Sequence, residues 1–489
     1  MRRIIPVLLC LFLLVPCATA EDTLFAWSLS IGGDGVTTPV DMAVASEGGV
    51  FIVGHTTSEG GDLGEGYGNK DGFVLRLSAN GTVLWQRRLG GTEDDTFTSV
   101  VETPDGGCLA LGSTLSTDGD ARASRGGMDA WIVRLDAEGE TVWTKSLGGS
   151  LDDELLVLQI TEEGTYFACG RTMSRNGDLG ANFGGWDAWA TMLSAEDGKP
   201  LWNYRYGFSG DDVFLAAHPA ANGWLLLGEI AEESGQDEDG NPLYTSRPIA
   251  QMLSFTGEPS WEEPVLLGDT GVNKLTSILE IESGWLLAGT TNTRSSLMPS
   301  THGGVDIWML HLRQNGTVAW QRSYGGRLNE SFHSMQKLPS GGYLLLGGTN
   351  STDSQVYGAH GGEDVWLVHI SASAVQRWQQ PIGGTEDSWP AGLLQREDGS
   401  LLVAGTTVSQ DGDIGRHISV RTGFLSLLGP NGNLQSTQVT SGTEEMTLLQ
   451  IKADDGIAYL LGSVRSINAD GPTESIWIGR LLMEGFLGE

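Results

Sequence analysis

One pattern of residues recurs along the chain at a nearly constant interval, and this repeat constrains the fold more than any other feature. Successive tryptophans are 58, 58, 59, 59, 59 and 58 residues apart. They are Trp27, Trp85, Trp143, Trp202, Trp261, Trp320 and Trp378. An eighth unit keeps the register from Ser436 but has lost its tryptophan. Fixed periods of this kind indicate solenoids, propellers or similar arrays.

Each unit contains four segments with the composition of short β-strands. In the second unit they are Thr98–Thr103, Gly107–Ser113, Ala130–Asp136 and Thr141–Leu147. They are rich in aromatic and β-branched residues and partly alternate between apolar and polar. Turns containing Asp and Gly separate the first two and the last two strands, and a long polar loop separates the middle two. Four antiparallel strands in each of eight units predict an all-β, eight-bladed β-propeller.

The two ends of the chain predict how the ring closes. The last unit stops at Glu489, before a tryptophan-bearing strand, whereas Leu24–Leu29 has the sequence of that missing strand. An N-terminal strand that completes the last blade would leave no exposed sheet edge. We therefore expect residues 21–489 to form one propeller domain, with units starting near residues 27, 85, 143, 202, 261, 320, 378 and 436.

The first 20 residues have the pattern of a secretory signal. Arg2 and Arg3 precede an apolar run that ends near Val15, and an Ala-x-Ala site ends at Ala20. The run is too short to span a bilayer, which takes about 20 apolar residues. We expect cleavage and export to the periplasm or the bacterial surface. A lipid anchor on Cys17 is an alternative, but the preceding proline disfavours it.

The net charge narrows the class of partner, and the cysteine content bears on disulfides. The formal net charge is −34, which argues against nucleic acids and anionic membranes, because both attract basic surfaces. Divalent cations stay open as partners, and we expect a monomer. Cys108 and Cys169 remain after cleavage, and two buried free thiols are favoured over a disulfide.

The repeat motif resembles a known family. In the second unit the motif consists of a Gly-Gly pair followed by an acid, a D-G-G turn, a G-x-T-x-S segment and a D-x-W strand. It comprises Gly90, Gly91, Asp94, Asp105–Gly107, Gly112, Thr114, Ser116, Asp129, Trp131, Leu135, Gly139 and Trp143. This is similar to the bacterial SBBP-type β-propeller repeats. The resemblance implies an exported propeller and no particular activity, because a fold does not determine a function.

The long polar loops contain candidate calcium ligands. Asp62, Asp118, Asp120, Asp178, Asp411 and Asp413 lie in Gly-Asp runs, and Asp71, Asp129 and Asp187 follow nine residues after three of these runs. Ca²⁺ takes six to eight oxygen ligands from flexible loops. The spacing is compatible with Ca²⁺ at these residues, although no loop matches the twelve-residue EF-hand pattern. The alternative is that Asp and Gly form the turns and that the second Asp caps the strand that follows.

Two groups of residues break the repeat and are candidates for ligand binding. The recurring tryptophans are interpreted as blade packing, whereas Trp186, Trp224, Trp285 and Trp389 lie off the pattern. Unit four lacks the D-x-W element and instead has an acidic loop containing Glu232, Glu233, Asp237 and Asp239. Departures from local consistency tend to mark functional sites. A drifted surface loop is the simpler alternative.

No catalytic motif stands out. The chain has no G-x-S-x-G, H-E-x-x-H, C-x-x-C or P-loop sequence, and its paired acids recur in most units, as structural turns would. We therefore predict a non-enzymatic binding or scaffold protein that contacts protein or polysaccharide through its loops. One alternative is an enzyme with its site in the central funnel, because Leu193–Tyr204 resembles the tryptophan motif of quinoprotein propellers. Another alternative is an outer-membrane assembly factor.

Overall fold

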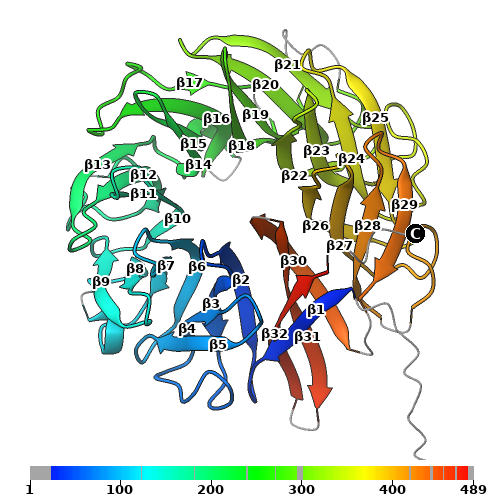
Figure 1. Ribbon diagram of the computed structural model, residues 1–489. Helices are drawn as coiled ribbons and strands as arrows, with labels where there is room; N and C mark the ends of the chain where they lie inside the picture. The colour runs from blue at the N-terminus through cyan, green and yellow to red at the C-terminus, as the bar shows by residue number, and fades with distance from the viewer. Residues whose placement is uncertain are drawn as a thin grey trace, which may run out of the picture.

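The computed structural model describes residues 24–122, 124–180, 182–237, 241–269, 271–293, 301–417, 420–440, 444–454, 456–468 and 471–482. The predicted signal segment lies outside these residues. Within them, the strands form eight antiparallel sheets of four strands each. Figure 1 shows the sheets arranged as blades around a common centre. The chain is an eight-bladed β-propeller, as the repeat predicted.

The first strand of each blade lies nearest the centre of the ring. These inner strands are β2 Thr37–Val44, β6 Asp95–Glu102, β10 Asp153–Ile160, β14 Val213–Ala220, β18 Asn273–Ile281, β22 Glu330–Lys337, β26 Ser388–Gln395 and β30 Glu445–Asp454. The second strands are β3 Val50–Thr56, β7 Cys108–Thr114, β11 Tyr166–Thr172, β15 Gly223–Gln236, β19 Gly284–Thr291, β23 Tyr343–Thr349, β27 Leu401–Thr407 and β31 Ile457–Asn468.

The third strands are β4 Asp71–Leu77, β8 Asp129–Leu135, β12 Asp187–Leu193, β16 Pro242–Ser254, β20 Asp306–Arg313, β24 Asp364–Ile370, β28 Thr422–Leu428 and β32 Gly471–Leu481. The outer strands are β5 Val83–Leu89, β9 Thr141–Leu147, β13 Pro200–Tyr206, β17 Val265–Leu266, β21 Val318–Tyr324, β25 Gln376–Ile382, β29 Leu434–Val439 and β1 Phe25–Ile31. A 3-10 turn, η1 Gly119–Ala121, lies between β7 and β8.

The N-terminal strand closes the ring as predicted. β1 pairs with β32, so the last blade has the order β1-β32-β31-β30. Blades are numbered 1 to 8 in chain order, with β2–β5 as blade 1. An apolar cluster joins this last blade to the first and includes Tyr459, Ile476 and Met42. The last blade is thereby joined to the start of the chain by pairing with β1 and by packing against β2.

The core lies between neighbouring blades. The middle strands are buried on both faces, and β7 and β8 are almost continuously apolar for that reason. Phe97 of blade 2 stacks on Trp131 with ring centres 4.7 Å apart. Cys108 and Cys169 are buried and form no disulfide, as expected, and burial raises the pKa of the Cys108 thiol to about 12.

The outer tryptophans join each blade to the next. The indole Nε1 of Trp85 donates a hydrogen bond to the carbonyl oxygen of Ala137, 2.8 Å away in the hairpin turn of the following blade. Gly139 of the same turn packs against this indole, where a Cβ would lie 2.6 Å from the ring. Trp27, Trp143 and Trp202 make equivalent bonds. The packing interpretation of the recurring tryptophans is confirmed at these positions.

Inner strands begin earlier than the sequence predicted. β6 begins at Asp95 rather than Thr98, although Asp is a poor strand former. The Asp95 amide donates to the carbonyl oxygen of Lys70, 2.7 Å away in the preceding blade. Its side chain accepts further hydrogen bonds, so tertiary contacts determine the start of the strand.

Candidate functional site

Two sets of loops lie on the same face of the ring. One set runs from the outer strand of each blade to the inner strand of the next, and the other joins the second and third strands. They share a face because neighbouring strands are antiparallel. We call this the GG face, after the Gly-Gly pairs such as Gly90-Gly91 that begin the first set of loops.

Residues of the repeat form a hydrogen-bond network on this face, as the second unit shows. Asp95 is fully buried and accepts hydrogen bonds from the Gly91 amide at 2.7 Å and the Ser116 hydroxyl at 2.8 Å. Ser116 in turn accepts a bond from the Glu93 amide at 2.9 Å. Gly91 and Ser116 of the repeat motif, together with Asp95 next to the motif acid Asp94, therefore hold one blade junction together.

The same arrangement recurs at other junctions. Asp153, Asp212 and Glu330 occupy the position of Asp95, and each accepts a bond from the amide of the second residue of its loop. These distances are 2.8, 2.7 and 2.9 Å respectively. Burial raises the pKa of each of these acids, and for Asp212 to about 7.

Four junctions contain two facing acids with a glycine between them. A Cβ on Gly148 would lie 2.4 Å from Asp129 Oδ1 and 2.3 Å from Asp153 Oδ2. Only glycine fits between these carboxylates. The equivalent sets are Asp71, Gly90 and Asp95; Asp187, Gly207 and Asp212; and Asp306, Gly325 and Glu330.

Cations reach these acids from two different positions in the repeat. Arg88 on an outer strand lies 2.8 Å from Asp71, and both side chains are buried. In blades 5 and 6 the residue at the position of Arg88 is Ser323 or Pro381. In these blades a histidine four residues before the acid lies close to its carboxylate instead. The His302 imidazole lies 3.5 Å from Asp306, and the interaction with this nearby carboxylate raises the histidine pKa. His360 lies at the same distance, 3.5 Å, from Asp364.

Asp129 has no arginine from the outer strand beside it, because Ser146 occupies the position of Arg88. Its Oδ2 accepts one bond from the Arg125 amide at 2.6 Å, while its buried Oδ1 has no hydrogen-bond partner. Burial consequently raises the pKa of Asp129 to about 6.

The predicted calcium ligands lie in this network. Asp62 Oδ2 and Asp120 Oδ2 each accept a bond from the first glycine amide of a loop, at 3.0 and 3.3 Å. Asp118 and Asp411 accept bonds from the Thr92 and Thr385 amides, at 2.9 and 2.8 Å. Within the described ranges, no three His, Cys, Asp or Glu side chains are grouped to hold a metal.

The remaining acids of that prediction also have protein partners. Asp178 lies 2.9 Å from Arg125, and Asp187 accepts a bond from the Phe183 amide at 3.1 Å. Asp413 lies 3.8 Å from His360. These contacts favour the alternative in which Asp residues shape the turns, and calcium binding stays a prediction.

Two of the four off-pattern tryptophans are core residues. Trp224 is 1% exposed and stacks on Phe167 at 4.0 Å, and Trp285 is 3% exposed beside Trp261. Both begin a second strand, at the position that Tyr166 occupies in blade 3. Aligning the D-G-G segments would have shown them to be repeat residues. Blade packing buries both side chains, which disfavours ligand contact at Trp224, whereas Trp285 also lines a cleft of about 290 Å³ and stays a predicted ligand contact.

Trp186 and Trp389 do lie on the GG face and are half-buried. The Arg171 guanidinium lies 4.3 Å from the Trp186 ring centre, and that of Arg421 lies 5.7 Å from Trp389. Each tryptophan therefore already has a cation on its ring.

The acidic segment of unit four forms a projecting hairpin. β15 and β16 extend beyond their neighbours, with Glu233 paired to Tyr244 and Gln236 to Pro242. We call residues 229–237 and 241–248 the blade 4 arm. Glu232 is half-buried, Glu233 and Asp237 are exposed, and Asp239 lies outside the described residues. Leu243 and Tyr244 are 49% and 47% exposed.

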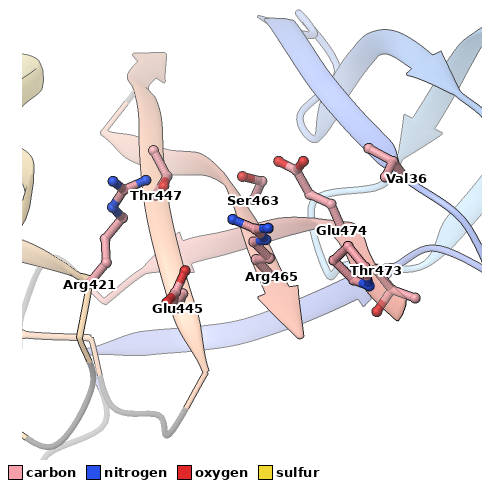
Figure 2. A pocket seen from close by; sticks show the side chains of 9 residues that line it. Val36, Arg421, Glu445, Thr447, Ser463, Arg465, Thr473 and Glu474 are labelled. Carbon is pink, nitrogen blue, oxygen red and sulfur yellow. The ribbon is translucent and has the colours of Figure 1, made fainter. Parts of the chain in front are cut away.

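A cleft that the sequence did not predict lies where blades 7, 8 and 1 meet. Its volume is about 270 Å³, and Arg421, Glu445, Arg465 and Glu474 contribute to its lining. Figure 2 shows Arg465 between Glu445 and Glu474, with Thr447 and Ser463 beside them. The only sequence signal was that the repeat motif weakens in the last two units.

The comparisons with known proteins do not assign a role to the chain. No family model matches the chain. The regulatory protein FlaEY of Caulobacter vibrioides is 24% identical over 376 residues, covering 73% of this chain and 35% of that protein. The chain thus spans about a third of the curated relative that it matches.

Solved structures are similar only at low TM-scores. The Pan2 WD40 domain of Neurospora crassa is 10% identical, with coverage of 92% and 89% and a TM-score of 0.38. An apocarotenoid oxygenase variant from Synechocystis is 11% identical, with coverage of 85% and 93% and a TM-score of 0.42. Drosophila Plexin A, in complex with Semaphorin 1b, is 9% identical, with coverage of 93% and 87% and a TM-score of 0.37. At these values none of them bears on the function of this chain.

Proposed function

We propose that this protein is an exported, non-catalytic binding module that contacts a protein partner through the GG face, with the blade 4 arm as its main contact. The observation that supports this most is the arm itself. It replaces the usual polar loop with a long hairpin carrying exposed acids beside exposed Leu243 and Tyr244.

The wider GG face has the composition of an interaction surface. Large apolar side chains are exposed on its loops: Tyr67, Leu115, Leu151, Phe183, Val272, Leu328, Tyr357 and Val420 are each at least 44% exposed. Tyrosine and other aromatic residues are enriched at protein interfaces, whose rims are polar. Apolar residues spread over several blades suit a broad protein surface.

Charge suggests which surface of a partner would dock. The net charge of −34 and the arm acids Glu233 and Asp237 favour a partner patch that is basic and partly apolar. No helix in the described part of the chain is long and apolar enough to cross a bilayer. The signal pattern supports export, and the relative FlaEY is a regulatory protein.

Site-specific photo-crosslinking in the producing cell tests this proposal. A benzophenone amino acid replaces Tyr244 on the arm, and a matched variant carries it at Leu84, which is 56% exposed on an outer strand near the opposite face. We expect one protein adduct that is specific to position 244. Equal adducts at both positions, or none at position 244, would contradict the proposal.

A further inference from the structure

The cleft between blades 7, 8 and 1 contains a row of alternating charges on neighbouring strands. In the β30–β31–β32 sheet, Glu445 is directly opposite Arg465, and Arg465 is directly opposite Glu474. Residues directly opposite one another project from the same face of a sheet. Figure 2 shows the three side chains on the cleft side of these strands.

These three charged groups do not neutralise one another. Opposite charges on facing strands usually pair, yet no hydrogen bond or ion pair joins the side chains of Glu445, Arg465 or Glu474 to any described residue. Arg465 is exposed, and both glutamates are half-buried. Their charged groups are therefore available to a ligand.

Further polar groups complete the lining. Thr447 is directly opposite Ser463 in the next row of the same face, and both line the cleft. Arg421 reaches the cleft from blade 7. The lining thus offers guanidinium and hydroxyl donors for a carboxylate, and two carboxylates for a cationic donor.

The balance of charge and the size of the cleft select a class of ligand. A dianion such as phosphate would face two glutamates, and a metal cation would face two arginines, so each would meet like charges. About 270 Å³ is just below the range of about 300–1,000 Å³ typical of drug-sized ligands. A small zwitterion satisfies both constraints.

We propose that this cleft binds a free α-amino acid, with the carboxylate on Arg465 and the ammonium group on Glu474 or Glu445. This site is separate from the blade 4 arm and does not depend on a protein partner. Arg465 and Glu474 lie outside the repeat motif, because they occupy the positions of Leu115 and Met128 in the second unit, whereas Glu445 occupies the position of Asp94.

Calorimetry on the full chain tests the proposal. The probes are glycine, serine and glutamine, with acetate, ethylamine and glucuronate as comparisons. We expect saturable binding of the amino acids at least about tenfold tighter than that of acetate or ethylamine. Arg465→Gln should weaken this binding at least tenfold, and Glu474→Gln combined with Glu445→Gln should weaken it similarly.

The control variant is Arg327→Gln, because Arg327 is an exposed arginine in the GG-face loop between blades 5 and 6. It should bind amino acids as the unaltered protein does. Circular dichroism melts verify that each variant folds. Binding of acetate or glucuronate as tight as that of amino acids, no saturable amino-acid binding, or full binding by Arg465→Gln would each overturn the proposal.

Discussion

Asp71 and Asp129 occupy the same position in neighbouring repeats but have different partners, so the same substitution should affect them oppositely. Asp71 is held by Arg88 at 2.8 Å, whereas Asp129 accepts a single amide bond and has Ser146 at the position of Arg88. In both acids the buried Oδ1 has no hydrogen-bond partner. Asparagine is nearly isosteric with aspartate and carries no charge. Asp129→Asn should therefore stabilise the protein at pH 8, and Asp71→Asn should destabilise it.

The size of the Asp129 effect follows from its pKa. Burial raises this pKa from 3.8 to about 6, which corresponds to about 3 kcal/mol as an upper limit. Because the pKa of Asp129 is higher in the folded state than in the unfolded state, the folded state binds more protons between pH 3.8 and about 6. The contribution of Asp129 to stability is therefore fully present below pH 3.8 and is lost as the pH rises through about 6.

Asp71→Asn removes the counter-charge of a buried guanidinium. Breaking such a pair from one side costs about 3–5 kcal/mol. Urea unfolding at pH 8 and pH 5 measures both effects. The gain from Asp129→Asn should shrink at pH 5, where the folded protein is mostly protonated at this residue. Shifts of the same sign in both variants, or an unchanged pH dependence in Asp129→Asn, would refute the reasoning.

Three further predictions concern the junctions and the core. Gly148→Ala should lower the free energy of unfolding by about 2–3 kcal/mol, because the added Cβ would overlap two buried carboxylates. In the control Gly60→Ala, the added Cβ meets no atom within 4 Å, so the free energy of unfolding should change by less than about 0.5 kcal/mol. Cys108 and Cys169 should not react with a thiol reagent until the protein unfolds, because both are buried and burial raises both pKa values; rapid labelling of the native protein would contradict this. Removing Ca²⁺ with a chelator should leave the melting temperature unchanged, because the acids of the polar loops already accept bonds from amides; a clear decrease would restore these loops as calcium sites.

The repeat made the architecture predictable from the sequence, including the contribution of the first strand to the last blade. The constant tryptophan register and the complementary ends of the chain carry that information directly. The start of β6 was not predictable from propensity, because a network spanning two blades places Asp95 in the strand.

The candidate site was predicted less well. The arm could be located because unit four departs from the repeat. Trp186 and Trp389, which also lie off the repeat pattern, are on the GG face. Trp224 and Trp285 were placed off the repeat pattern because they were compared with the outer tryptophans, although both share the position of Tyr166. The cleft depends on ring closure, which brings Val36 beside Glu474 from the other end of the chain, and no local pattern contains that contact.

The most direct test of the binding proposal is the affinity of the partner captured at Tyr244 for three forms of the protein. These are the unaltered chain, Glu233→Lys on the arm, and Glu163→Lys, a matched reversal at an exposed turn between β10 and β11 on the opposite face. We predict that Glu233→Lys weakens binding about tenfold or more while Glu163→Lys leaves it unchanged. Equal affinities for all three forms would contradict the assignment of the GG face as the binding surface.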